Sequence, residues 1–278
     1  MNPIAPEAIS LPATITIDVD PVLLRLGHLS VGWYGIVIAL AIVVSFVVVR
    51  REARRHNLDE DAVMRVTGWA VAGGLLGARA LHVADRWQTY ASDPLRIFAF
   101  QQGGLAIQGA LLGGLIAGII AARRSGVPVW TLADAAAPGV VLGQGIGRLG
   151  CLFTGDALGG PTALPWGVVY TNPARMAPQL GVALQPVFAY EALWDLAVFA
   201  VLWMLRGRLG KPGRLFATYL GLYAAGKFAI TSLRQEPTWA WGLQEAQILA
   251  MLLLVIAAGL WLLGPRQSRG TFAAQEGN

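Results

Sequence analysis

The sequence has little charge and almost no cysteine. Only 13% of its 278 residues are charged, about half the ~25% of a soluble domain, so an ordinary water-soluble globule is excluded. Its single cysteine, Cys151, excludes an internal disulfide. No repeat of 20–50 residues is visible, so nothing supports a duplicated transporter fold. Hydrophobic residues make up 55%, and they fall into long blocks, which is typical of an all-α, polytopic membrane protein.

The apolar blocks predict seven transmembrane helices in one bundle. A hydrocarbon core of ~30 Å needs about 20 apolar helical residues to cross it. Seven stretches meet or approach this length: 31–49, 66–84, 103–122, 129–147, 186–205, 215–233 and 246–264. We therefore expect residues 1–278 to form a single membrane-embedded domain, with an extracytoplasmic segment at 1–30 and a cytoplasmic tail at 265–278.

The basic residues predict the orientation of this bundle. Lys and Arg accumulate in loops on the cytoplasmic side of membrane proteins. Twelve of the 21 basic residues follow spans one, three, five and seven: Arg50, Arg51, Arg54, Arg55, Arg123, Arg124, Arg206, Arg208, Lys211, Arg214, Arg266 and Arg269. This places the N-terminus outside and the C-terminus in the cytoplasm. The same residues explain the net charge of +5 without nucleic acid as a partner, because they also attract anionic lipid.

Small residues recur every four positions, which lets helix backbones approach closely in lipid. The clearest sets are Gly73 and Gly77, Gly109 and Gly113, Gly114 and Gly118, and Gly139, Gly143 and Gly147. We expect tight helix packing there.

Several spans carry an ionisable side chain, which costs at least ~2.5–3.5 kcal/mol at bilayer depth. The candidates are Arg79, Asp134, Arg148, Glu191, Asp195 and Lys227. They can pair as buried salt bridges or face a polar cavity. Four of them, Arg79, Arg148, Glu191 and Lys227, lie toward the outer ends of their spans, so we expect a cavity in the outer half.

The glycine-rich segment 143–161 contains Arg148 and, eight residues later, Asp156. Glycine lets a chain leave the helix and expose backbone N–H groups, and arginine offers a fixed fork of donors to phosphate. We therefore interpret this segment as a phospholipid headgroup site. Asp156 can neutralise the arginine or handle a proton. Cys151 is interpreted as a packing residue, because no histidine lies close in sequence to activate it.

These residues resemble a known family, the bacterial prolipoprotein diacylglyceryl transferases, from about residue 20 to 264. The segments that carry the resemblance are Trp33-Tyr34-Gly35, Gly77-Ala78-Arg79, Asp93-Pro94-Leu95, Gly103-Gly104-Leu105, Gly147-Arg148-Leu149-Gly150 with Gly155 and Gly159, Pro186 with Tyr190-Glu191, Arg234, and Gln247-Ile248-Leu249. Their order along seven spans matches the family.

The resemblance implies an enzyme of the bacterial cytoplasmic (inner) membrane. Such an enzyme moves the diacylglyceryl group of phosphatidylglycerol to the lipobox cysteine thiol of a preprolipoprotein. Neither a cofactor nor a metal is implied. By this analogy the catalytic residues are Arg148, Arg234 and Asp156, and the substrate-binding residues are Tyr34, Arg79, Gly104, Gln108, Gly159, Glu191 and Lys227.

The sequence departs from the family pattern at several polar positions. The family's histidine after Gly-Gly-Leu is Gln108, which cannot serve as a base near neutral pH, and His82 is a weaker replacement candidate. Cys151, Gly160 and Thr231 also stand where the family has polar or charged residues. The alternative is therefore a phospholipid-binding membrane paralogue without catalysis or with altered activity.

Overall fold

The computed structural model describes residues 14–27, 29–99 and 103–264. Most of them are helical, as the sequence predicts. The long helices are α1 (Trp33–Arg55), α2 (Glu60–Asp85), α4 (Ile107–Arg124), α5 (Val129–Thr154), α6 (Val187–Leu205), α7 (Arg214–Thr231) and α8 (Glu245–Leu263). Each overlaps one of the seven apolar blocks. Among the described residues, five of them, α1, α4, α5, α6 and α8, are long and apolar enough to cross a membrane.

The chain divides into two compact units. Unit 1 comprises Met1–Val47, Gly139–Val201 and Leu222–Leu252, and unit 2 comprises Val48–Pro138, Leu202–Gly221 and Leu253–Asn278. The predicted tail at 265–278 and much of the predicted segment 1–30 lie outside the described residues.

Unit 1 holds short strands that the all-α prediction did not include. Parallel β1 (Ile15–Ile17) pairs with β4 (Val168–Tyr170), which also pairs with β5 (Ala183–Leu184). Two hairpins complete the set, β2 (Val22–Leu26) with β3 (Leu29–Gly32) and β6 (Thr238–Ala240) with β7 (Leu243–Gln244). These strands are two to five residues long, too short for a period-2 pattern to be recognised.

A small hydrophobic core joins these strands to the end of α5. It contains Ile17, Val168, Tyr170 and Leu184 together with Cys151, which is 5% exposed. The Tyr170 hydroxyl donates to the Leu152 carbonyl at 2.9 Å. Cys151 is therefore a packing residue, as predicted.

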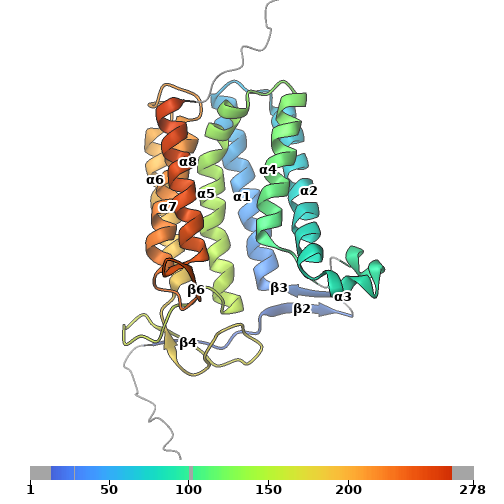
Figure 1. The fold of residues 1–278 in the computed structure, drawn as a ribbon, viewed down its shortest axis with the longest axis vertical. Coiled ribbons are helices and arrows are strands. Elements are labelled where there is room, and N and C mark those ends of the chain that lie inside the picture. The colour runs from blue at the N-terminus through green and yellow to red at the C-terminus, as the bar shows by residue number, and fades with distance from the viewer. Residues whose placement is uncertain (1–13, 28, 100–102, 265–278) are drawn as a thin grey trace, which may run out of the picture. The chain divides into compact units, whose positions relative to one another are not determined.

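Unit 2 is built around α2 and α4, which run side by side (Figure 1). A Cβ added to Gly77 would collide with the backbone of Gly109 and Gly113, and one added to Gly113 would collide with Gly73. The four-residue glycine spacing therefore gives the predicted close approach of two helices. The short helices α3 (Trp87–Ala91) and η1 (Pro94–Phe98) follow α2.

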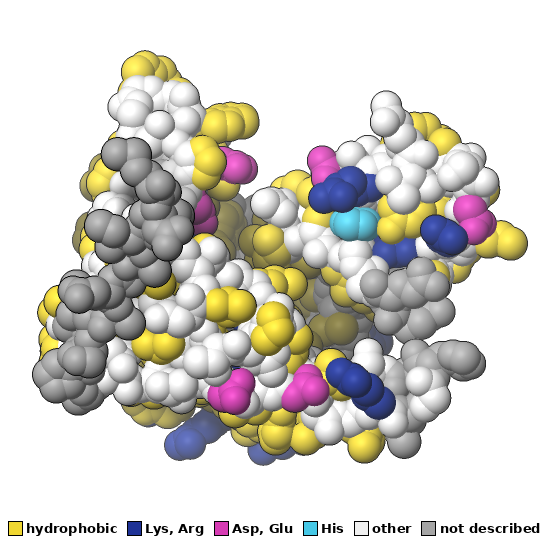
Figure 2. All heavy atoms as spheres, turned by 90° about the horizontal axis from the view of Figure 1, so that it is seen from below, with side chains coloured by type: hydrophobic (Ala, Val, Ile, Leu, Met, Phe, Trp, Pro, Cys, Tyr) yellow, Lys and Arg dark blue, Asp and Glu magenta, His cyan; other side chains and the backbone are white. Residues whose placement is uncertain are grey.

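Many large hydrophobic side chains are exposed, as expected of a surface that faces lipid. Leu111 and Leu115 on α4 are 65% and 58% exposed, and Val255 on α8 is 70% exposed. Figure 2 shows hydrophobic side chains at the surface, with only a few charged ones among them.

Candidate functional site

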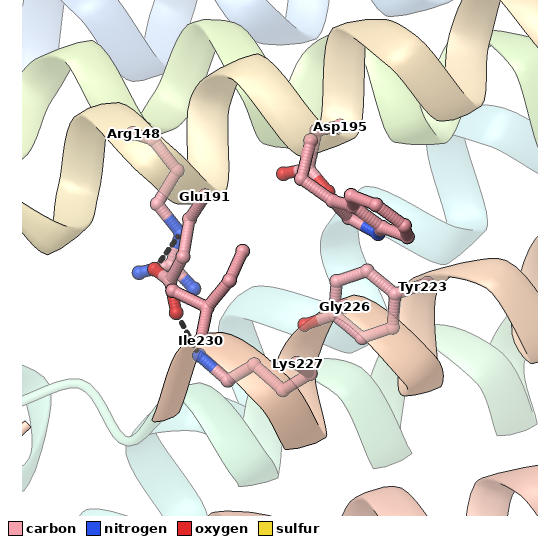
Figure 3. A pocket seen from close by; sticks show the side chains of 8 residues that line it. Arg148, Glu191, Asp195, Tyr223, Gly226, Lys227 and Ile230 are labelled. Atoms are coloured by element: carbon pink, nitrogen blue, oxygen red, sulfur yellow. Dashed lines mark hydrogen bonds and ion pairs between the residues drawn. The ribbon is translucent and has the colours of Figure 1, made fainter. Parts of the chain in front are cut away.

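Three of the predicted site residues meet in unit 1. Arg148 on α5 places its Nε 2.9 Å from Oε2 of Glu191 on α6. Lys227 on α7 places its Nζ 2.6 Å from Oε1 of the same carboxylate. Figure 3 shows both cations directed at Glu191. We call Arg148, Glu191 and Lys227 the Glu191 cluster.

The Glu191 cluster is buried at its centre and opens outward at its arginine. The side chain of Glu191 is 5% exposed, that of Lys227 16% and that of Arg148 27%. Two cations therefore contact one carboxylate, which leaves the cluster with one surplus positive charge. Because these cations are partly shielded from water, they attract an anion more strongly than fully solvated cations do.

A small pocket adjoins the Glu191 cluster. Its other lining residues are Trp194, Asp195, Tyr223, Gly226 and Ile230. The Trp194 indole Nε1 donates to the Leu222 carbonyl at 3.0 Å, and its ring occupies the space where a Cβ at Gly226 would stand. This fit fixes α6 against α7. Trp194, Gly226 and Tyr223 carry no charge or known motif, so sequence reasoning missed them.

The glycines next to Arg148 stay within α5, so the expectation that they let the chain leave the helix at the arginine was wrong. α5 continues to Thr154, and only Gly155, with a φ of +74°, leaves it. The glycines instead receive neighbours: Gly145 faces Asp195 and Ala192 of α6, and Gly150 faces the ring of Tyr34 on α1. Helical packing, rather than exposed backbone N–H groups, is the reason for glycine here.

The loop after α5 brings together two predicted residues, Gly159 and Arg234. They form an isolated antiparallel bridge, and a Cβ at Gly159 would lie 2.6 Å from the Leu233 carbonyl oxygen. Arg234 also pairs with Glu236 at 3.0 Å, a partner that the sequence analysis missed. Asp156 accepts a hydrogen bond from the Thr154 hydroxyl.

A buried arginine in this region stabilises the end of α5. Arg175, 7% exposed, donates to the Phe153 carbonyl and lies 5.6 Å from the Tyr170 ring centroid. A cation is favoured at a helix C-terminus. Burial lowers the pKa of Arg175 and raises that of Tyr170.

The predicted residues of unit 2 form a separate arrangement around Arg79. This buried side chain donates to four backbone carbonyls, those of Arg96, Ile97, Gly103 and Gly104, at 2.5–3.0 Å. Gly104 has a φ of +75°, and a Cβ there would lie 2.6 Å from His82 Nε2. Arg79 thus holds the segment that leads into α4, where Gln108 is exposed.

Among the described residues, no group of three or more His, Cys, Asp and Glu side chains is arranged to hold a metal ion. The donors of the site are instead guanidinium and ammonium groups, which fit an anionic ligand.

Comparison with known proteins agrees with this chemistry. The family model for prolipoprotein diacylglyceryl transferase matches residues 21–263. A phosphatidylglycerol–prolipoprotein diacylglyceryl transferase of Trichormus variabilis is 39% identical over 87% of this chain and 89% of the relative. The enzyme of the same name from Synechococcus elongatus is 38% identical over 89% of each chain, and that from Shouchella clausii is 33% identical over 88% and 90%. The chain therefore belongs to the prolipoprotein diacylglyceryl transferase family.

Proposed function

We propose that this chain transfers the diacylglyceryl group of phosphatidylglycerol to the lipobox cysteine thiol of a prolipoprotein. The observation that carries the proposal is the Glu191 cluster, a buried carboxylate with two cations in a chain of this family. Its two cations can donate hydrogen bonds to the phosphate oxygens of a phosphodiester. The relatives named above supply the identity of the lipid and of the acceptor.

The reaction forms a bond between sulfur and a glycerol carbon and breaks the bond between that carbon and a phosphate oxygen. Negative charge grows on the phosphate as it leaves as glycerol 1-phosphate. Cations that are preorganised at that position stabilise the transition state more than the ground state. We assign this role to Arg148 and Lys227, and Glu191 holds both in place.

The remaining predicted residues keep their proposed roles. Arg234 is a third phosphate contact and Asp156 a polar group near the reacting centre, with Gly159 allowing close approach of the chain. Tyr34 orients the lipid. Arg79 supports substrate binding by holding the segment from which Gly104 and Gln108 contact substrate.

Seven spans, an external N-terminus and a place in the bacterial inner membrane complete the proposal. In a Cys151→Ala background, we expect Thr162→Cys to be labelled by an impermeant thiol reagent added to intact spheroplasts. Ser125→Cys should be labelled only after lysis. Equal labelling of both positions would contradict the orientation.

The decisive experiment is reconstitution of the purified chain with phosphatidylglycerol and a lipobox peptide. We expect a thioether-linked diacylglyceryl peptide and glycerol 1-phosphate in equal amounts. Lipid binding without any product, while a relative is active under the same conditions, would favour the non-catalytic phospholipid-binding alternative. The substitutions at Gln108 and Thr231 support that alternative.

A further inference from the structure

The pocket beside the Glu191 cluster contains a second carboxylate, that of Asp195. It lies on α6 one helical turn after Glu191 and is 3% exposed. Within the parts of the chain that the structure describes, no hydrogen bond or ion pair engages this carboxylate. A buried carboxylate that accepts no hydrogen bond is uncommon in folded proteins, and Asp195 lines a pocket in which a ligand could meet its oxygens.

The two carboxylates of the pocket differ in what their oxygens contact. Both oxygens of Glu191 lie within 3 Å of a cation, Arg148 or Lys227. Neither oxygen of Asp195 has such a contact. Glu191 therefore holds charges in place, whereas Asp195 remains available to accept a proton from a ligand.

The surroundings of Asp195 are defined from three helices. The charged and titratable groups that line the pocket with it are Arg148 from α5, Glu191 from α6, and Tyr223 and Lys227 from α7 (Figure 3). On the α5 side, a Cβ added to Gly145 would lie 3.3 Å from the Asp195 Cβ. The backbone of α5 therefore packs directly against Asp195. The acid thus occupies a fixed position between a packed wall and the pocket.

We propose that Asp195 is the group that takes the proton from the lipobox thiol. The assignment rests on the proposed function. The thiol S–H bond breaks and its proton moves to an Asp195 carboxylate oxygen, while sulfur bonds to the glycerol carbon and the phosphate oxygen leaves with the bonding pair. The proton then leaves with the glycerol phosphate or passes to water, which restores the carboxylate.

Charge balance in the pocket supports this role. With Asp195 ionised, the charges of Arg148, Lys227, Glu191 and Asp195 sum to zero. When Asp195 accepts the thiol proton, the pocket gains one positive charge at the moment when the leaving phosphate gains one negative charge. Stabilisation thus increases in the transition state, where it accelerates the reaction.

The test compares Asp195→Asn with Asp134→Asn in the full chain, in vesicles of phosphatidylglycerol with a lipobox peptide. General-base catalysis is worth about 10²- to 10⁴-fold, so we expect Asp195→Asn to lower kcat by about 10²-fold or more at pH 7. The KM for phosphatidylglycerol should change far less than kcat. Asp134 is a matched control because it is a buried acid whose oxygens accept the backbone N–H groups of Gly213 and Phe216.

The pH profile separates proton transfer from a merely structural role. A free cysteine thiol ionises near pH ~8.5, so the substrate needs less help from a base as the pH rises past that value. We expect the defect of Asp195→Asn to shrink between pH 7 and 9.5, and Asp195→Glu to recover part of the turnover.

Three results would overturn the assignment. One is wild-type turnover in Asp195→Asn, and another is a defect of equal size at every pH, because neither is expected when a base is lost. If the wild type itself makes no thioether, the proposed function fails and the assignment falls with it. An active wild type with either of the first two results overturns the Asp195 role alone.

Discussion

Two clusters in this chain have the same composition, a buried glutamate between two cations, but differ in their surroundings. The Glu191 cluster belongs to unit 1. In unit 2, Glu52 is 1% exposed and lies 3.3 Å from Arg55 and 3.1 Å from Arg206, which we call the Glu52 cluster. The number and sign of the charges are equal in both clusters.

The Glu52 cluster has its cations engaged on other sides too. The Arg206 guanidinium lies 3.4 Å from the Trp203 ring centroid, and Arg55 donates to the Arg206 carbonyl at 3.2 Å. The Glu191 cluster instead adjoins a pocket that holds a further acid, Asp195. A buried ion triad is therefore not by itself a sign of function. The pocket and the unengaged acid beside the triad distinguish a site that can act on a ligand.

The largest expected effect is on turnover, when one arginine of each cluster is replaced by alanine. We expect Arg148→Ala to reduce kcat for diacylglyceryl transfer by about 10²- to 10³-fold, as loss of one preorganised donor does elsewhere. Arg206→Ala should retain transfer in the folded fraction and lower the melting temperature instead. Turnover is measured on protein that passes size exclusion as a single species.

A matched pair sharpens this prediction. Arg148→Lys keeps the charge but not the fork of donors, so its turnover should fall between those of the wild type and Arg148→Ala. If Arg206→Ala lost as much kcat as Arg148→Ala while remaining folded, the distinction between the two clusters would be wrong.

The next effect concerns stability in unit 2. Breaking a buried pair costs about 3–5 kcal/mol because a charge remains uncompensated. Arg55 and Arg206 keep side chains 42% and 25% exposed, so their charges can reach solvent, and we expect Glu52→Gln to cost about 3 kcal/mol. Thermal unfolding in detergent measures this. Glu191→Gln should affect transfer more than the melting temperature, and the reverse ranking would refute the comparison.

A buried acid without cations extends the comparison. Asp134 on α5 accepts from Gly213 N at 2.7 Å and Phe216 N at 2.8 Å, at the first turn of α7. An acceptor at a helix N-terminus satisfies its free N–H groups. Asp134→Asn leaves one acceptor oxygen and turns an N–H group toward a donor, so we expect a loss of about 1–3 kcal/mol. An unchanged melting temperature would contradict this account.

Some of this arrangement could be predicted from the sequence, because it depends on local pattern. Apolar blocks of about 20 residues predicted the long helices, and glycines at every fourth position predicted the contact of α2 with α4. The expense of charge in lipid singled out Arg148, Glu191 and Lys227 before their contacts were known. In each case a single requirement, such as an apolar surface in lipid or space for a neighbouring backbone, limits which residue types a position accepts.

The rest required the packed structure. Glycine permits both a helix break and a close helix contact, and only the neighbours of Gly145 and Gly150 decide for the contact. Arg79 was expected to orient lipid or to pair with other charges, whereas its guanidinium on α2 donates to the carbonyls of Arg96, Ile97, Gly103 and Gly104. Which charges meet depends on how helices distant in sequence pack, and no local pattern encodes this.

The smallest effect concerns a third glutamate with two cations, this time in contact with solvent. Glu60 pairs with Arg50 at 2.7 Å and with Arg54 at 2.5 Å. The hydrogen bond from Arg54 and then that from Arg50 lower the pKa of Glu60 from 4.5 to about 2. Because the folded-state pKa is depressed, the pair stabilises the fold above pH ~4.5, and this contribution is lost as the pH falls toward 2. The melting temperatures of the wild type and Glu60→Gln should therefore differ slightly at pH 6 and converge near pH 2. Salt should reduce the difference at pH 6 because exposed pairs are screened, and a difference that persists at pH 2 would show that Glu60 acts through something other than its charge.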